Sequence, residues 1–159
     1  MTRWQGWGER RMITIVLAED HKIVREGIRL LLDAEDELQV IGEAGNGADA
    51  VQLVRSLRPD ILITDLVMEG MNGIQVTNLS REHSPGTRVI VLSMYSSDTY
   101  VSAALEHGAT GYVVKGSGVD ELVRAIHEAM SGRRYLSPPL TEQGVMDYRQ
   151  RGRDAAPDP

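Results

Sequence analysis

The sequence contains no cysteine among its 159 residues. This absence excludes disulfide bonds, thiol nucleophiles, iron–sulfur clusters and cysteine zinc sites, and it fits a reducing compartment. Long hydrophobic runs are missing too, because the longest apolar segments, at residues 61–63 and 89–92, are far shorter than a membrane span of about 20 residues. We therefore expect a cytoplasmic domain without a membrane partner, stabilised by the packing of its core.

Positive charge is also scarce. The chain has 17 Lys and Arg residues against 23 Asp and Glu residues, which gives a formal net charge of −6. Such a chain lacks the basic surface that phosphate backbones attract, so we expect no direct nucleic-acid binding by this segment. Lys22 and Lys115 are the only lysines, and chemistry that needs an ammonium group therefore has two candidates.

From residue 13 onward, short apolar segments alternate with segments of helical periodicity. The pattern predicts strands at residues 13–18, 38–42, 61–64, 88–93 and 111–114. It predicts helices at residues 22–33, 48–58, 72–83, 97–107 and 119–131. Pro59 stops the second helix, and Asn72 is expected to cap the third.

Two of these helices carry apolar residues along one face. In the first helix they are Ile23, Val24, Gly27 and Leu31. In the last helix the inner face consists of Leu122, Val123, Ile126 and Met130. Both sets have the spacing of an amphipathic helix that packs against a sheet.

The fold class follows from the character of the strands. They are continuously apolar rather than alternating, which favours a parallel sheet covered by helices on both faces. We predict a doubly wound α/β fold with a five-stranded parallel sheet and five flanking helices. The length fits one domain with tails: an N-terminal extension at residues 1–12, the domain at residues 13–134, and a linker and C-terminal tail at residues 135–159.

Chemistry in such a sheet gathers outside the carboxyl ends of its strands. The residues at those ends are Glu19, Asp20, Asp65, Ser93 and Lys115. Three carboxylates placed together repel one another unless a cation lies among them. Because no cysteine or histidine cluster accompanies these oxygens, Mg²⁺ or Mn²⁺ is favoured over Zn²⁺, with the lysine as a fixed positive charge opposite.

These strand-end residues, together with residues 65–73 (DLVMEGMNG), resemble the receiver domain of bacterial two-component response regulators. The similarity covers residues 13–134. Residues 132–138 (GRRYLSP) further resemble the NarL/FixJ subfamily, whose members carry a LuxR-type helix-turn-helix domain after a linker. The resemblance implies a CheY-like, flavodoxin-like fold and a chain without its DNA-binding domain.

The resemblance also implies a phosphoacceptor and a cation site. Asp65 would accept a phosphoryl group from a sensor histidine kinase, since a carboxylate can serve as the nucleophile. Asp20 and Asp65 would bind Mg²⁺ directly, the backbone carbonyl of Val67 would add a ligand, and Glu19 would act through water. The protein would catalyse only its own phosphorylation and dephosphorylation and would not be an enzyme that turns over a substrate.

The remaining residues of the pattern concern the phosphoryl group and the response to it. Lys115 would neutralise charge on the transferring oxygens, and Ser93 would bond to the bound phosphoryl group. A shift of Ser93 would leave room for Tyr112 to turn inward and change the nearby surface. The resemblance implies a homodimer on phosphorylation and control of transcription through the missing domain.

Three residues near the site, Glu69, Val67 and Tyr95, affect what the resemblance implies. Glu69 stands where the family usually has proline, so the loop loses a φ restraint and gains a negative charge. Val67 lies two residues after the acceptor and cannot align a water through its side chain, and Tyr95 is placed to cover the site. We therefore expect slow self-dephosphorylation.

Two other functions stay open at this point. A degenerate receiver would act as a constitutive docking module. Such a domain would lack the acceptor, a metal ligand or the lysine, and this sequence has all of them. A Mg²⁺-dependent phosphatase with an aspartate nucleophile usually has a second aspartate two residues later, where this chain has Val67.

Several other residues are given structural roles. Met68 and Met71 are expected to pack in the core. The histidines share no ligand spacing and are expected on helix surfaces; they are His21, His83, His107 and His127. Residues 45–47 form a turn, and the tail beyond residue 140 is a solvated linker with a weak helical signal at residues 141–149.

Overall fold

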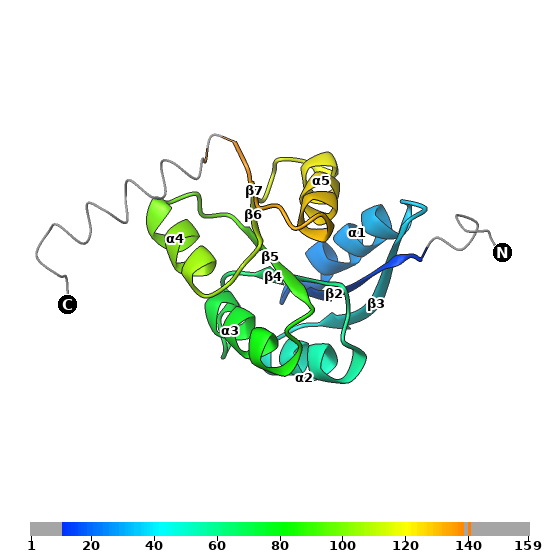
Figure 1. Ribbon diagram of the computed structural model, residues 1–159, viewed down its shortest axis with the longest axis horizontal. Helices are drawn as coiled ribbons and strands as arrows, with labels where there is room; N and C mark the ends of the chain where they lie inside the picture. The colour runs from blue at the N-terminus through cyan, green and yellow to red at the C-terminus, as the bar shows by residue number, and fades with distance from the viewer. Residues whose placement is uncertain (1–10, 139, 141–159) are drawn as a thin grey trace, which may run out of the picture.

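The computed structural model describes residues 11–138 and 140. Most of the expected extension, and the expected linker and tail at residue 139 and from residue 141 onward, lie outside the described residues. Six parallel strands form one sheet in the order β3-β2-β4-β5-β6-β7 (Figure 1). The strands are β2 (Ile13–Ala18), β3 (Leu38–Ala44), β4 (Ile61–Asp65), β5 (Arg88–Ser93), β6 (Gly111–Val114) and β7 (Tyr135–Leu136).

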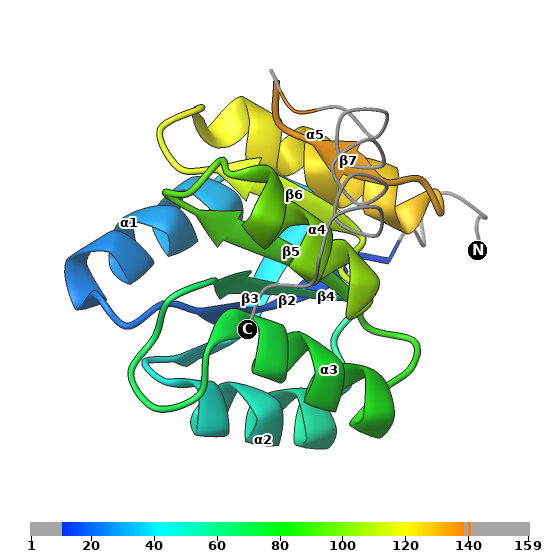
Figure 2. The same cartoon turned by 90° about the vertical axis from the view of Figure 1, so that its left-hand side faces the viewer.

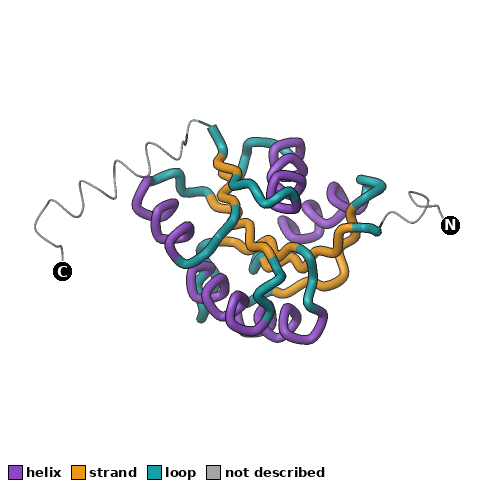
Figure 3. The backbone as a smooth tube through the Cα atoms, viewed as in Figure 1, coloured by secondary structure: helices purple, strands orange, loops and turns teal. Residues whose placement is uncertain are grey.

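Five helices connect these six strands, in alternation along the chain (Figure 3). They are α1 (Lys22–Asp33), α2 (Gly47–Leu57), α3 (Gly73–His83), α4 (Asp98–Glu106) and α5 (Val119–Met130). The predicted doubly wound α/β class is confirmed. The structure adds the two-residue strand β7, from a segment that the sequence pattern assigned to the linker.

The helices divide into two layers. Helices α1 and α5 cover one face of the sheet, and α2, α3 and α4 cover the other, as Figures 1 and 2 show together. Leu32 of α1 and Ile126 of α5 belong to a core with Ile15, whereas Val54 of α2 and Val76 of α3 pack with Leu62 on the opposite face. Every central strand is therefore covered on both sides, as its continuous apolar sequence predicts.

Local signals place the helix ends. Asn72 and Gln75 form a capping box, in which each side chain accepts a hydrogen bond from the other residue's backbone N–H at 2.9 Å. Asn46 caps α2 by accepting from the N–H of Asp49. The expected cap at Asn72 is confirmed, and it fixes where α3 begins relative to the end of β4.

The apolar face of α1 does not point where its periodicity suggested. Ile23 is 84% exposed and Leu31 is 52% exposed, while Leu32 is fully buried and Ile28 packs against the core. Two stripes of α1 are apolar, and the sheet takes the one through Ile28 and Leu32. The inner face predicted for α5 is confirmed, because its four apolar residues are buried or pack against the core.

The order of the strands sets the position of the site. Among the described residues β2 is the first strand; β3 pairs with it on one side and β4 on the other, so the winding reverses between β2 and β4. Open α/β sheets bind ligands in the crevice at this point, beyond the carboxyl ends of the strands. Among the described residues, none of the helices has the length and apolarity that spanning a membrane requires.

Candidate functional site

The predicted strand-end residues meet around one lysine. Lys115 follows β6, and its Nζ donates to Glu19 Oε1 at 2.6 Å and to Asp65 Oδ2 at 2.9 Å. The two carboxylates lie 96 and 50 residues from it in the sequence. One of the two ammonium groups of the chain therefore joins the ends of β2, β4 and β6.

The shared ammonium affects the two carboxylates differently. Burial would raise the pKa of Glu19, which is 1% exposed, but hydrogen bonds from Lys115 and His21 outweigh it and lower this pKa to about 2. Burial raises the pKa of Asp65, with a further contribution from the charge of Glu19, although Lys115 opposes both. The carboxylates raise the pKa of Lys115 against the effect of its own burial. Glu19 is thus firmly ionised, and Asp65 is the less stabilised charge.

Three adjacent residues at the end of β2 could hold a cation. One ligand atom each from Glu19, Asp20 and His21 lies within 4.8 Å of the others. Asp20 Oδ1 is buried and has no hydrogen-bond partner, although His21 Nδ1 lies 3.2 Å from it. A buried carboxylate oxygen without a donor is costly. The two carboxylates therefore suit a hard divalent cation, which fits the expected Mg²⁺ or Mn²⁺.

His21 was expected only as a surface residue. Its side chain is largely exposed, but its Nδ1 lies 3.1 Å from Glu19 Oε2 and its backbone N–H donates to the same oxygen at 3.0 Å. Histidine spacing along the chain gave no signal, because the partners are the two residues directly before it.

The loop after β4 is held close to Asp65. The backbone N–H of Val67 points at Asp65 Oδ1 across 3.4 Å, and the side chain of Val67 is exposed. A Cβ on Gly73 would lie 2.3 Å from the carbonyl oxygen of Asp65, so only glycine allows α3 to start here. Sequence reasoning did not single out Gly73. The expected packing of Met68 and Met71 is confirmed by their place beside the core under α2 and α3.

Ser93 and Tyr112 lie on the other side of Asp65. Ser93 is fully buried at the end of β5, and its Oγ accepts from the N–H of Tyr95 at 3.0 Å. Tyr112 is also fully buried, and its hydroxyl donates to the carbonyl of Tyr95 at 2.6 Å. Burial raises the pKa of Tyr112, while its hydrogen bond with Ser93 opposes this. Tyr112 was expected to turn inward on activation, but in this structure it already lies inward.

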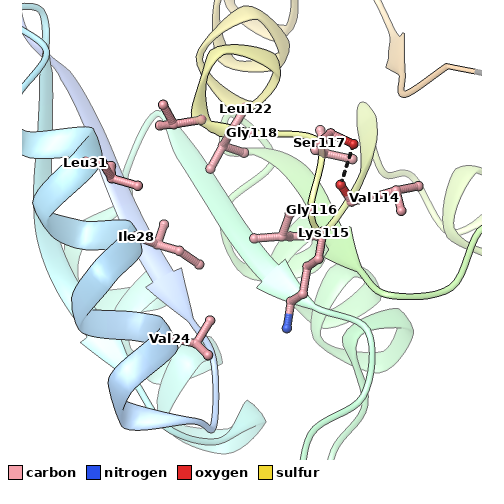
Figure 4. A pocket seen from close by; sticks show the side chains of 12 residues that line it. Val24, Ile28, Leu31, Val114, Lys115, Gly116, Ser117, Gly118 and Leu122 are labelled. Carbon is pink, nitrogen blue, oxygen red and sulfur yellow. Dashed lines mark hydrogen bonds between the residues drawn. The ribbon is translucent and has the colours of Figure 1, made fainter.

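An apolar hollow of about 320 Å³ opens between α1 and the loop that leads from β6 into α5 (Figure 4). Val24, Ile28 and Leu31 line it from α1, and Leu122 lines it from α5. Lys115 is the one charged residue among the described residues that line it. Apolar surroundings on this side strengthen the attraction of the ammonium for the carboxylates on the other.

Comparisons with known proteins agree with this arrangement. The response regulator receiver domain matches residues 15–127. Response regulator GacA of Pseudomonas aeruginosa is 36% identical over 132 residues, which cover 83% of this chain and 62% of that protein. The nitrate/nitrite response regulator protein NarL of Escherichia coli is 38% identical over 128 residues, covering 80% of this chain and 59% of that protein.

A solved structure shows the same fold. The crystal structure of a two-component response regulator of the LuxR family from Aurantimonas sp. SI85-9A1 is 36% identical, with a TM-score of 0.81 over 87% of this chain and 99% of that one. The chain spans about three fifths of the length of the two curated relatives. The match over most of the chain, the identities and the shared fold show that it belongs to the response regulator receiver domain family, with relatives of the NarL and LuxR type.

Proposed function

We propose that this domain is a phosphorylation switch whose acceptor is Asp65. The observation that carries the proposal is the bridge formed by Lys115 between two carboxylates. Glu19 is firmly ionised, whereas the ionised form of Asp65 is less stabilised. An acceptor needs a free oxygen, and Asp65 Oδ1 has only the long contact from Val67, whereas Oδ2 is held by the lysine. The arrangement orients one oxygen toward an incoming phosphorus.

The chemistry is a single transfer. A bond forms between an Asp65 carboxylate oxygen and the phosphorus as the bond from phosphorus to the imidazole nitrogen of the donor histidine breaks. Lys115 then lies beside the new phosphoryl oxygens and offsets their charge. Asp20 and Asp65, with the carbonyl of Val67 and with Glu19 through water, would hold Mg²⁺ or Mn²⁺, which supplies further neutralisation of those oxygens when bound.

The response would begin at Ser93. Its hydroxyl belongs to the strand next to β4, and a bond to the phosphoryl group would draw it toward Asp65. Because Tyr95 bonds to both Ser93 and Tyr112, that movement would shift the start of the segment leading into α4. We propose that the conformational response passes through the contacts of Tyr95 with Ser93 and with Tyr112, whose ring stays buried.

The partners follow from the family. We propose a sensor histidine kinase as the phosphoryl donor, homodimerisation on phosphorylation, and control of transcription through a helix-turn-helix domain distinct from the receiver domain. The two curated relatives, of which the chain spans about three fifths, are named as response regulators. One solved relative is named as a member of the LuxR family. We propose a cytoplasmic location and a role as a switch rather than as an enzyme with turnover.

Intact mass measurement after incubation with acetyl phosphate and Mg²⁺ tests the proposal. We expect one phosphoryl adduct in the wild-type chain, none in Asp65→Asn, and an unchanged adduct in Asp49→Asn, which removes an exposed carboxylate on α2. An absent adduct in the wild type would favour a constitutive docking module. Repeated release of inorganic phosphate from added phosphate esters would favour the phosphatase.

The lifetime of the phosphorylated form is a separate expectation. Val67 presents an exposed apolar side chain beside Asp65, and it has no group that could align a hydrolytic water. We expect the adduct to persist far longer than seconds after acetyl phosphate is removed, and Val67→Asn to shorten its life. Decay of the wild-type adduct within seconds in Mg²⁺ would contradict this expectation.

A further inference from the structure

Arg25, in the first turns of α1, reaches back to the residues that precede the helix. Its Nη1 donates to the backbone carbonyl of Glu19 at 2.7 Å, and its Nε donates to Glu43 Oε1 at 3.2 Å. The side chain is 17% exposed. The guanidinium is therefore largely enclosed and spans three elements, from α1 to the end of β2 and to β3.

Both backbone polar groups of Glu19 are hydrogen-bonded, and Arg25 provides one of the two contacts. The backbone N–H of Glu19 donates to the carbonyl of Ala44 at 3.0 Å, and Arg25 holds the carbonyl of the same residue from the other side. Glu43, the second partner of Arg25, directly precedes Ala44 in β3. The carbonyl that Arg25 holds belongs to the peptide bond that leads into Asp20, so this contact limits where the Asp20 carboxylate can lie.

The turn after β3 leaves space for the guanidinium. A Cβ added at Gly45 would lie 3.2 Å from Arg25 Nη1, which is closer than ordinary packing allows. Gly45 is not one of the described glycines with a positive φ, so its backbone conformation alone does not require glycine. The position of Arg25 is thus a reason for a small residue there.

We propose that Arg25 is a positioning residue for the cation site formed by Glu19 and Asp20. The inference rests on the proposed function, since it assumes that this site takes Mg²⁺. The charge of Arg25 opposes cation binding, because a positive group close to the site repels a second one. Its benefit is therefore geometric: it fixes the peptide that carries the two carboxylates, as residues that orient metal ligands do.

The two effects of Arg25 have opposite signs, and this makes the test decisive. Loss of charge alone would strengthen Mg²⁺ binding, whereas loss of positioning would weaken it. Arg29 offers a matched control, because it also pairs with Glu43 and is not hydrogen-bonded to Glu19. Each variant leaves Glu43 with the other arginine, so neither creates an unpaired carboxylate there.

The experiment is a titration of the phosphate-free protein with Mg²⁺ alone, followed by calorimetry or by backbone amide shifts. We expect Arg25→Gln to bind Mg²⁺ about tenfold more weakly than the wild type, in the range that residues orienting metal ligands typically give. Arg29→Gln is expected to bind as tightly as the wild type or slightly more tightly. Binding by Arg25→Gln that equals or exceeds the wild type would overturn the inference.

Two further measurements separate positioning from misfolding and from failure of the proposed function. In metal-free protein we expect faster amide hydrogen exchange at Glu19 in Arg25→Gln and not in Arg29→Gln. Gly45→Ala keeps every charge but crowds Nη1, and we expect a few-fold loss of Mg²⁺ affinity; unchanged affinity would count against the role. A wild-type chain that binds no Mg²⁺ overturns the proposed function and this inference together, whereas unchanged binding by Arg25→Gln overturns only the inference.

Discussion

Asp65 lies between two flanks that differ in the kind of contact they make. Toward β2, charged groups are linked in series, with Lys115 bound to Glu19 and Arg25 bound to the Glu19 carbonyl. Within β5 and β6 the contacts are neutral, because the Ser93 and Tyr112 hydroxyls bond to the backbone of Tyr95. Lys115, which follows β6, belongs to the charged flank because it reaches across to Glu19. Charge is thus concentrated on the side where a cation would bind, and hydroxyl groups on the side of β5.

The neutral flank continues to the edge of the sheet. The backbone carbonyl of Tyr112 accepts from the N–H of Ser137, just after β7, at 3.0 Å. The side chains of Tyr135 and Ser137 both donate to Glu121 Oε1 on α5, at 2.8 and 3.0 Å. The segment that leads out of the domain is therefore bound to the same strand as Tyr112. The charged flank reaches the opposite edge strand, β3, through the ion pair of Arg25 with Glu43.

The energetic cost of the site lies mainly in its charged flank. Ionised groups that are taken out of water are stable only with partners, and the removal of one partner leaves the other as an unpaired buried charge. Each neutral hydrogen bond is worth much less, about 1 kcal/mol. Variants in the charged flank should therefore change stability and cation affinity strongly, and variants in the neutral flank should change stability weakly and cation affinity not at all.

Lys115→Met should have the largest effect. It leaves Glu19 buried without its ammonium partner, and removal of one member of a buried ion pair typically costs about 3–5 kcal/mol. We expect a loss of about 3 kcal/mol in the free energy of unfolding, measured with urea. Lys22→Met removes the other lysine, an exposed one at the start of α1, and should change stability by less than about 0.5 kcal/mol. Equal effects of the two variants would contradict the comparison.

Glu19→Gln tests the pH dependence of the charged flank. The pKa of Glu19 falls from 4.5 to about 2 in the folded protein, so its contribution is complete above pH 4.5 and is lost as the pH falls toward 2. We expect the wild type to lose about 2–3 kcal/mol across this window from this group, on the scale of 1.4 kcal/mol per pKa unit. Glu19→Gln should be less stable at pH 7 and should show a flatter acid profile, and identical profiles would refute the assignment.

Asp65→Asn should change stability in the opposite direction. The pKa of Asp65 is raised in the folded protein, so its ionised form opposes folding, and stability is lost as the pH rises through the folded pKa. The neutral amide removes that cost at pH 7. We expect a gain in the free energy of unfolding, measured by urea unfolding in metal-free buffer. A destabilised Asp65→Asn would mean that the bond to Lys115 outweighs burial and the repulsion by Glu19.

The contrast between the flanks also explains what the sequence could predict. Asp65, Lys115 and their neighbours lie at strand ends, and parallel strands bring their carboxyl ends together whatever the detailed packing. Asn72 was predictable for a similar reason, because a capping box is local. The fold class and the convergence of Glu19, Asp65 and Lys115 therefore followed from pattern alone.

The features that pattern missed depend on packing between distant segments. Strand β7 has two residues, too few for any periodicity. The spacing of apolar residues in α1 shows that Ile23 and Leu31 share a face, but it does not show that the sheet covers the neighbouring stripe. Arg25 and Gly73 act on backbone carbonyls of other elements, and no side-chain pattern records such a partner.

Tyr112→Phe should have the smallest effect and gives the sharpest test of the neutral flank. It removes a buried hydroxyl and leaves the carbonyl of Tyr95 without that donor, which typically costs about 1 kcal/mol. The ring remains in the core, so no cavity forms. We expect Mg²⁺ affinity equal to that of the wild type, together with faster amide exchange in the segment between β5 and α4. If the variant instead weakens Mg²⁺ binding as Arg25→Gln is expected to do, the two flanks are coupled in the resting state, and the division between a charged side and a responsive side does not hold.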